Sequence, residues 1–283
     1  MIETCDLHTH SIYSDGTLSP AALICLAQEQ KISAVALCDH NTVAGLPEFL
    51  AAARESAVEA VPGVEFSTEY RAQELHILGL FVEPQHYAAV TEKLAQMLRW
   101  KEQSNLALVQ ALQKTGMALE YGAIKAQTPD GQVNRAVIAA EMVRKGYCKS
   151  VKEAFSKWLS IACGYYHPPR RLDAFETIRF IKSIGAVAVL AHPFLNLDEA
   201  ELYAFLPDAA AAGLDAMEVY YSGFSEAQMK RAAEIADRFG LLYSGGSDFH
   251  GANKPDIQLG TGKNNLCISC GVLEKLAEKR KLM

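Results

Sequence analysis

A chain of 283 residues has room for one large domain or two small ones. Half of the residues are hydrophobic and 21% are charged, which is typical of a protein with a buried core and excludes a disordered chain. No apolar run approaches the roughly 18 residues of a membrane span, and the first ten residues lack the pattern of a secretory signal. The net charge of −6 argues against a general DNA-binding surface. The seven cysteines are scattered, and we expect reduced thiols in a cytoplasmic protein.

Short apolar runs alternate with helical stretches in the first part of the chain. Strands are predicted over residues 4–7, 34–37, 61–66 and 75–81, with a second helix over 43–57. Ser19 followed by Pro20 is a helix start, because serine caps the free backbone N–H groups and proline suits the first helical position. That first helix is expected to end near Lys31. The alternation favours parallel strands with helices outside them.

The same alternation returns in the last part of the chain. Helices are predicted over residues 173–183, 199–212, 226–239 and 272–281, with strands over 186–190, 215–220 and 241–244. Seven strands in this arrangement predict an α/β fold, a closed or nearly closed β/α barrel.

Residues 84–168 separate strands four and five, which is far more than a crossover helix needs. Helices are predicted there over 87–115, 121–126, 135–145 and 151–159. We therefore expect a barrel of residues 1–83 and 169–283 and a helical insertion of residues 84–168. The insertion holds 11 Lys and Arg against 6 Asp and Glu, whereas the remainder holds 16 against 27. This contrast fits either solvated helix faces or a basic cap over an acidic, metal-loaded site for an anionic substrate.

Most of the histidines and three acidic residues stand at or just after predicted strands. The ends of barrel strands converge on one face, where catalytic residues gather. Buried carboxylates need compensating charge, which metal cations supply. The sequence therefore predicts a metal site formed by His8, His10, Asp15, His40, Glu65, His76, His192, Asp248 and His250. His86 and His167 lie in the insertion and are expected not to be ligands.

This mixture of imidazole and carboxylate suits Zn, Fe or Mn, with Mg as a further candidate, and the lack of positioned thiolate argues against a closed structural zinc. Nine ligands are too many for one ion and predict two or three. Three divalent ions carry more charge than three carboxylates, so the site would attract a phosphate dianion.

Six motifs in order along the chain resemble the PHP (polymerase and histidinol phosphatase) superfamily. They are Asp6-Leu7-His8-Thr9-His10, Ser14-Asp15-Gly16, Asp39-His40, Gly63-Val64-Glu65, Ala191-His192-Pro193 and Ser247-Asp248-Phe249-His250. The length and the insertion resemble the small stand-alone members, which include nucleotide phosphatases and short-RNA 5′→3′ exonucleases. The resemblance implies a distorted barrel of seven strands.

The resemblance also implies a division of the ligands among three ions. One ion would be held by His8, His10, Glu65 and Asp248. A second would share Glu65 and be completed by His76 and His192, and the third would be held by Asp15, His40 and His250. The family's Arg-Pro-His element reads Arg135-Ala136-Val137 here, so Arg135 is a candidate catalytic phosphate contact, whereas Val137 replaces the histidine. Asp39 is a second candidate, either orienting a ligand histidine or capping the following helix.

The expected activity is hydrolysis of phosphate monoesters by a metal-bridging hydroxide. The expected substrates are nucleoside 5′- or 3′,5′-bisphosphates or short oligonucleotides, with no duplex DNA and no membrane as partner. A histidinol-phosphate phosphatase is the closest alternative. An amidohydrolase or a non-catalytic metal-stabilised module are more distant ones. The sequence leaves the leaving group, the metal and the oligomeric state open.

Overall fold

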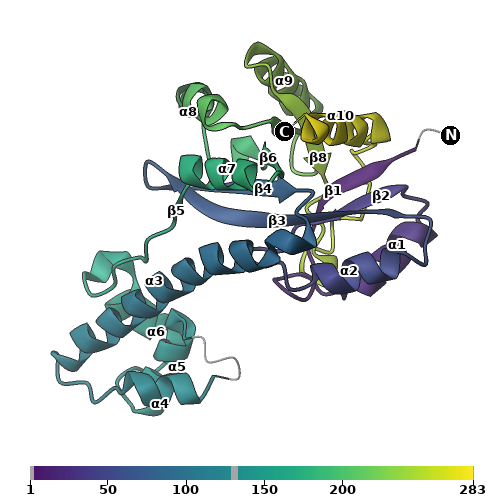
Figure 1. Cartoon of the computed structure of the whole chain (residues 1–283). Helices are drawn as coiled ribbons and strands as arrows, with labels where there is room; N and C mark the ends of the chain where they lie inside the picture. The colour runs from purple at the N-terminus through teal and green to yellow at the C-terminus, as the bar shows by residue number, and fades with distance from the viewer. Residues whose placement is uncertain (1–2, 129–132, 283) are drawn as a thin grey trace. The chain divides into compact units, whose positions relative to one another are not determined.

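Seven strands lie side by side in the computed structural model, which describes residues 3–128 and 133–282 (Figure 1). Their apolar residues are buried almost throughout, as expected for strands covered by helices. In spatial order they are β1 (Cys5–Thr9), β2 (Ala34–Leu37), β3 (Glu59–Tyr70), β4 (Gln73–Leu80), β6 (Val187–Leu190), β7 (Ala216–Tyr221) and β8 (Leu242–Gly246). A two-residue strand, β5 (Leu172–Asp173), pairs with β3 off this path.

The sheet closes on itself where β8 ends beside β1. The Asp248 amide donates to the His8 carbonyl and the His10 amide donates to the Phe249 carbonyl, both at 2.9 Å. Glycine is required at position 246, because a Cβ there would lie 2.4 Å from the Cβ of His8. The prediction of a nearly closed seven-stranded barrel is confirmed.

The expectation of parallel strands is wrong for one strand. β4 runs antiparallel to both of its neighbours, β3 and β6, whereas the other pairs of the barrel path are parallel. Only the two residues Arg71 and Ala72 separate β3 from β4, which suffices for a hairpin and is far too short for a parallel crossover. Both residues have positive φ, 50° and 65°, as hairpin turns require.

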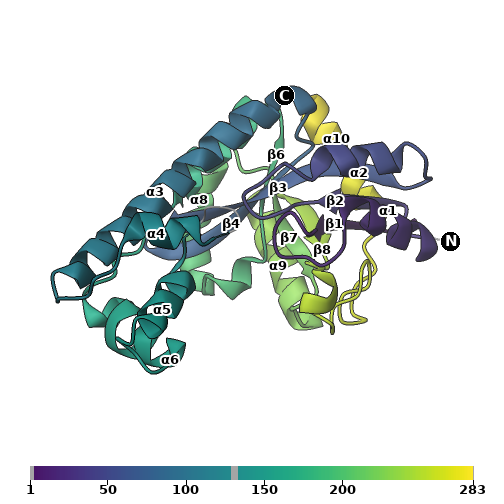
Figure 2. The ribbon, with the colours of Figure 1, turned by 90° about the horizontal axis from the view of Figure 1, so that it is seen from below.

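Helices cover the barrel, with α1 (Pro20–Glu29) and α2 (Leu46–Ala53) side by side next to β2 and β3 (Figure 2). Ser19 caps α1, as predicted, since its side chain accepts a hydrogen bond from the Ala22 amide. α2 begins and ends inside its predicted range of 43–57, and no side-chain hydrogen bond caps its start. The remaining barrel helices are α7 (Ala174–Ser183), α8 (Glu199–Ala212), α9 (Glu226–Arg238) and α10 (Cys270–Lys281).

The chain divides into two compact units, Met1–Glu92 with Leu172–Met283, and Lys93–Arg171. The boundary between Glu92 and Lys93 falls within α3 (Tyr87–Gln113), whereas the insertion was predicted to begin at residue 84. The second unit contains α4 (Tyr121–Ala126), α5 (Arg135–Arg144) and α6 (Val151–Ala154), followed by a π-helical turn over Phe155–Leu159. It has an apolar core of its own, separate from that of the barrel. In the part of the chain that the structure describes, no helix is long and apolar enough to cross a membrane.

Candidate metal centre

The nine predicted ligands come together at one end of the barrel. The parallel strands contribute residues at or just after their carboxyl ends. β4 contributes His76 from its first half, because an antiparallel strand begins at the edge where its parallel neighbours end. The contributions are His8 and His10 from β1, Asp15 from the loop that follows, His40 after β2, Glu65 on β3, His76 on β4, His192 after β6, and Asp248 and His250 after β8.

Glu65 lies at the centre of this cluster and is fully buried. Each of its two carboxylate oxygens faces a different set of imidazoles. Oε2 lies 3.0–3.3 Å from His40 Nδ1, His8 Nε2 and His10 Nε2, and Oε1 lies 2.7 Å from His76 Nδ1 and 3.2 Å from His192 Nε2. A carboxylate with this arrangement can be shared between two ions.

Asp248 adds a second carboxylate, and its two oxygens face different surroundings. Oδ1 lies 3.2 Å from His10 Nε2 and 3.5 Å from His250 Nδ1, inside the cluster. Oδ2 accepts hydrogen bonds from Tyr221 at 2.9 Å and from Lys254 at 2.8 Å. Asp248 also has a φ of 58°, a strained backbone conformation for a residue with a side chain. Its carboxylate is thus fixed by side chains that the sequence did not single out.

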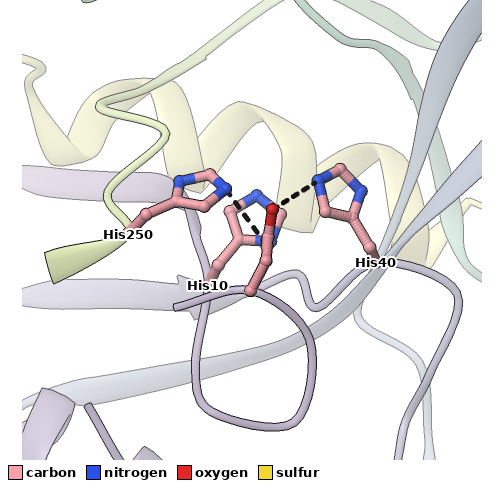
Figure 3. A group of neighbouring side chains, drawn as sticks. His10, His40 and His250 are labelled. Carbon is pink, nitrogen blue, oxygen red and sulfur yellow. Dashed lines mark ion pairs between the residues drawn. The ribbon is translucent and has the colours of Figure 1, made fainter. Parts of the chain in front are cut away.

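A third group surrounds Asp15, at the more open side of the cluster. The imidazoles of His10, His40 and His250 face one another there (Figure 3). Asp15 Oδ1 lies 3.2 Å from His250 Nε2, and its Oδ2 lies 3.8 Å from His40 Nε2. The Asp15 side chain is 55% exposed, so this group is open to solvent from the loop side.

The cluster has the features of a site built for cations. Within the described residues, His10 Nδ1 and Nε2, His8 Nε2, His40 Nδ1 and Glu65 Oε2 are buried and form no hydrogen bond of suitable geometry, although several of them lie close to one another. Buried polar atoms without partners are rare and call for a ligand. Three sets of donors converge closely enough to share an ion, namely His10, Asp15, His40 and His250; His8, His10 and Glu65; and His40, Glu65 and His76. His40 reaches both Asp15 and Glu65, whereas the family resemblance placed it only with Asp15 and His250. The residues present fit a metal centre of more than one ion.

Glu218 on β7 lies behind the cluster and was not among the residues predicted from the sequence. The buried carboxylate accepts a hydrogen bond from His8 Nδ1 at 2.9 Å and from the His192 amide at 2.6 Å. The first bond turns His8 Nε2 towards Glu65, and the second holds His192, whose φ is 29°. A histidine that donates to a carboxylate with one nitrogen and binds metal with the other is a common arrangement. The sequence did contain an indication of this role, because Glu218 is a lone acidic residue in an otherwise apolar strand.

The hydrogen bonds of Asp39 differ from both roles expected for it, because they go neither to a ligand histidine nor to the start of α2. The Asp39 carboxylate accepts hydrogen bonds from the Ser11 amide and hydroxyl and from the Ser14 hydroxyl, at 2.6–2.7 Å. Asp39 therefore fixes the loop that carries Asp15, and the orienting of a histidine is done by Glu218. Close packing also shapes this loop, since a Cβ at Gly16 would lie 2.4 Å from the His10 carbonyl oxygen.

Arg135, His86 and His167 lie in the insertion predicted over residues 84–168. Arg135 begins α5, donates to the Leu159 carbonyl at 3.1 Å, and lies 4.2 Å from the centre of the Tyr166 ring. His86 and His167 are absent from the three groups of potential metal donors that the described residues form. Whether Arg135 contacts substrate stays a prediction.

Attraction between the ligands shifts the pKa values of the carboxylates. Burial raises the pKa of Asp15, but the hydrogen bond with His250 and the charge of His40 outweigh it and lower that pKa to about 2. Burial likewise raises the pKa of Glu65, but the charge of His8 and the contacts with its other histidines hold it well below the ordinary value. Both carboxylates are therefore ionised at neutral pH.

The imidazoles shift in the opposite direction. Burial lowers the pKa of His8, but the charges of Glu65 and Glu218 outweigh it and hold that pKa well above its ordinary value. Burial also lowers the pKa of His76, but hydrogen bonds with Glu65 and Glu74 raise it to about 9. Without metal these histidines are protonated at neutral pH and must lose their protons to become ligands.

The stability of the metal-free protein should fall as the pH rises. A pKa raised on folding gives stability that is complete below the unfolded value of 6.5 and is lost as the pH passes about 9 for His76. Asp15 does not contribute in this range, because its lowered pKa gives stability that is lost only as the pH falls towards about 2. We expect thermal unfolding of EDTA-treated protein, followed by circular dichroism, to show a lower Tm at pH 9 than at pH 6.5. Metal-loaded protein should lack this decline, and equal Tm values for the EDTA-treated sample would contradict the assignment.

Comparisons with known proteins agree with this geometry. The sequence matches the PHP domain family over residues 6–166, more than half of the chain. It is 34% identical over 251 residues to a protein of Haemophilus influenzae named 5′-3′ exoribonuclease, covering 88% of this chain and 91% of the relative. It is 30% identical over 247 residues to the 3′,5′-nucleoside bisphosphate phosphatase of Chromobacterium violaceum, covering 87% of this chain and 86% of that protein.

A solved structure from Bifidobacterium adolescentis, described as a metal-dependent phosphoesterase, superposes with a TM-score of 0.70. It is 27% identical in sequence, and the match covers 98% of this chain and 96% of the other. The histidines and carboxylates converge at one end of the barrel, and the matches above agree with this geometry. We conclude that this chain belongs to the PHP domain family and is a metal-dependent phosphoesterase.

Proposed function

We propose that this protein binds two or three divalent ions, Mn, Fe or Zn with Mg as a further candidate, and hydrolyses phosphate monoesters of nucleotides or short oligonucleotides. The observation that carries the proposal is Glu65, whose two oxygens serve two sets of imidazoles. The relatives support the substrate class, because one is named for RNA and the other for nucleoside bisphosphates.

The residues of the cluster differ in burial, and their expected roles differ accordingly. Bound ions would activate water and neutralise the phosphate oxygens. His8, His10 and Glu65 are fully buried and form the fixed floor of the site. His40 and Asp15 are 26% and 55% exposed, so a phosphate can approach over them. Lys254, which is 39% exposed and bonded to Asp248, adds a positive charge at the same end of the barrel.

Arg135 remains our predicted phosphate contact. We also keep the prediction that the insertion caps the site. The Arg135 guanidinium uses a donor on the Leu159 carbonyl and keeps others, since arginine has five N–H groups. Arg135→Gln should raise the KM for nucleotides with little change in metal affinity. An unchanged KM would remove Arg135 from the substrate site.

The alternatives are less well supported. Histidinol phosphatase is not favoured, because the relatives above are named for RNA and nucleoside bisphosphates. Amidohydrolases commonly place a bridging lysine where Glu65 stands here. A non-catalytic module would not need the complete set of nine candidate ligand residues that meet in this barrel.

A phosphate-release screen tests the proposal. Metal-stripped protein would be loaded with Mn, Fe, Zn or Mg and offered mononucleotides, 3′,5′-bisphosphates, short oligonucleotides, histidinol phosphate and an amide substrate. We expect phosphate release from nucleotides that disappears with EDTA and returns with metal. Turnover of the amide alone, or of no phosphoester with any metal, would overturn it.

A further inference from the structure

A small pocket lies within the unit Lys93–Arg171, and nothing in the proposed reaction accounts for it. Its volume is about 350 Å³, and it is lined by Trp100, Gln103, Ser104, His167, Pro168, Pro169 and Arg170. All of these residues belong to the unit Lys93–Arg171. We call it the Trp100 pocket. Small-ligand pockets typically measure roughly 300–1,000 Å³, so it has room for one small organic group.

Two walls form the Trp100 pocket. Trp100, Gln103 and Ser104 lie three and four residues apart on α3 and so share one face of the helix. Opposite them runs the segment His-Pro-Pro-Arg, fixed to the helix by a hydrogen bond from the Ser104 hydroxyl to the His167 carbonyl. Successive prolines stiffen this segment, because each fixes its own φ.

The aromatic residue of the pocket is not explained by the core of the insertion. The chain has two tryptophans. Trp158 packs against the insertion core and lies 5.3 Å from the ring of Tyr165. Trp100, in contrast, is half-buried and lines the pocket. A half-buried indole that borders a cavity can stack on a nucleic-acid base.

Charge completes the chemistry of the pocket. The insertion is basic, yet Lys125, Arg144 and Lys157 are paired with glutamates within it. Arg170 and His167 also line the pocket and so bring a guanidinium and an imidazole to this part of the surface. A guanidinium matches the oxygens of a phosphate with two parallel hydrogen bonds. The stacking surface of Trp100 and the phosphate-binding group of Arg170 together suit one nucleotide.

We propose that the Trp100 pocket binds one nucleotide of single-stranded RNA, with the base on Trp100 and a phosphate on Arg170. This inference rests on the proposed function and deepens it, because it makes an oligonucleotide the preferred substrate over a mononucleotide. Stacking tolerates any base, so the pocket should show little sequence preference.

Fluorescence tests the binding without any turnover. Trp158→Phe leaves Trp100 as the single tryptophan, and EDTA prevents hydrolysis. A 5′-phosphorylated oligoribonucleotide of about six nucleotides should quench Trp100 emission saturably, and added salt should weaken the effect. Inorganic phosphate should leave the emission unchanged. If Trp158→Phe lowers the helical signal, the wild-type protein is compared with Trp100→Phe, in which the RNA-dependent change must vanish. No change in Trp100 emission at saturating RNA, or an equal change with an acidic peptide, would overturn the proposal.

Kinetics separates this inference from the proposed function. Trp100→Ala should raise the KM for the oligonucleotide about tenfold, in line with the loss of one stacked base. Arg170→Gln should also raise this KM and should reduce its dependence on salt, because it removes a phosphate contact. Both should leave kcat/KM for p-nitrophenyl phosphate unchanged. Lys152→Gln removes an exposed charge of the insertion outside the pocket and is the matched control. Unchanged KM in both variants would refute the pocket while leaving the phosphoesterase intact, whereas a wild-type protein inactive on every phosphoester would refute the function itself.

Discussion

Glu65→Gln is expected to abolish phosphate release while the barrel stays folded. The substitution keeps the shape of the side chain but removes the charge that five imidazoles share. Metal ions contribute several kcal/mol of transition-state stabilisation, and each 1.4 kcal/mol is a factor of ten. We therefore expect kcat to fall by about a thousandfold or more, together with the stoichiometry of bound metal. Phosphate release and metal content by atomic absorption measure the two effects.

Glu69→Gln provides the matched control for this variant. Glu69 lies on the same strand, β3, and is exposed. The same change of charge there should leave kcat and metal content as in the wild type. Circular dichroism should show both variants folded. Wild-type metal content in Glu65→Gln would mean that Glu65 is not a shared ligand.

The convergence of the nine candidate ligands could be predicted because most of them lie at or just after a predicted strand. His8-Thr9-His10 places two imidazoles on one face of β1, since side chains alternate along a strand. His40 and His192 follow short apolar runs, Ala34–Leu37 and Val187–Leu190, which the alternation with helices predicts as buried strands. The position of these residues at strand ends follows from local pattern, and convergence follows from barrel closure.

The direction of β4 could not be predicted in the same way. Its turn, Arg71-Ala72, lacks the glycine or asparagine that usually marks a hairpin, although both residues adopt positive φ. The predicted strands also stopped short of it, at residue 66 and from residue 75, which left room for a longer loop. The antiparallel direction matters to the site, because it brings His76 to the edge where Glu65 lies.

The supports of the ligands were missed for a different reason. Glu218, Tyr221 and Lys254 act through contacts with residues distant in the chain, such as His8 and Asp248. The spacing of residues along the sequence does not predict a contact of this kind. Asp39 shows the converse, because it adjoins His40 in sequence and yet its hydrogen bonds go to the loop of Ser11 and Ser14.

Glu218→Gln is expected to weaken metal binding about 10- to 100-fold, the effect typical of losing a carboxylate behind a metal-binding histidine. The carboxylate accepts from His8 Nδ1 and from the His192 amide at the same time. An amide group has one carbonyl oxygen, so its NH₂ group would face one of these donors and leave it unpaired. His8 would then lose its fixed orientation towards Glu65. Calorimetric titration with Mn or Zn measures the loss.

The dependence on metal concentration distinguishes this positioning role from a structural one. Because Glu218 acts through His8 and not on the substrate, excess metal should restore most of kcat, and the KM for the phosphoester should stay near the wild-type value. Glu226→Gln, an exposed change at the start of α9, should bind metal like the wild type. A Glu218→Gln protein that binds metal normally but has lost activity would show that the residue acts on the reaction directly. A protein that is unfolded even with saturating metal would show that its role is in the core of the barrel.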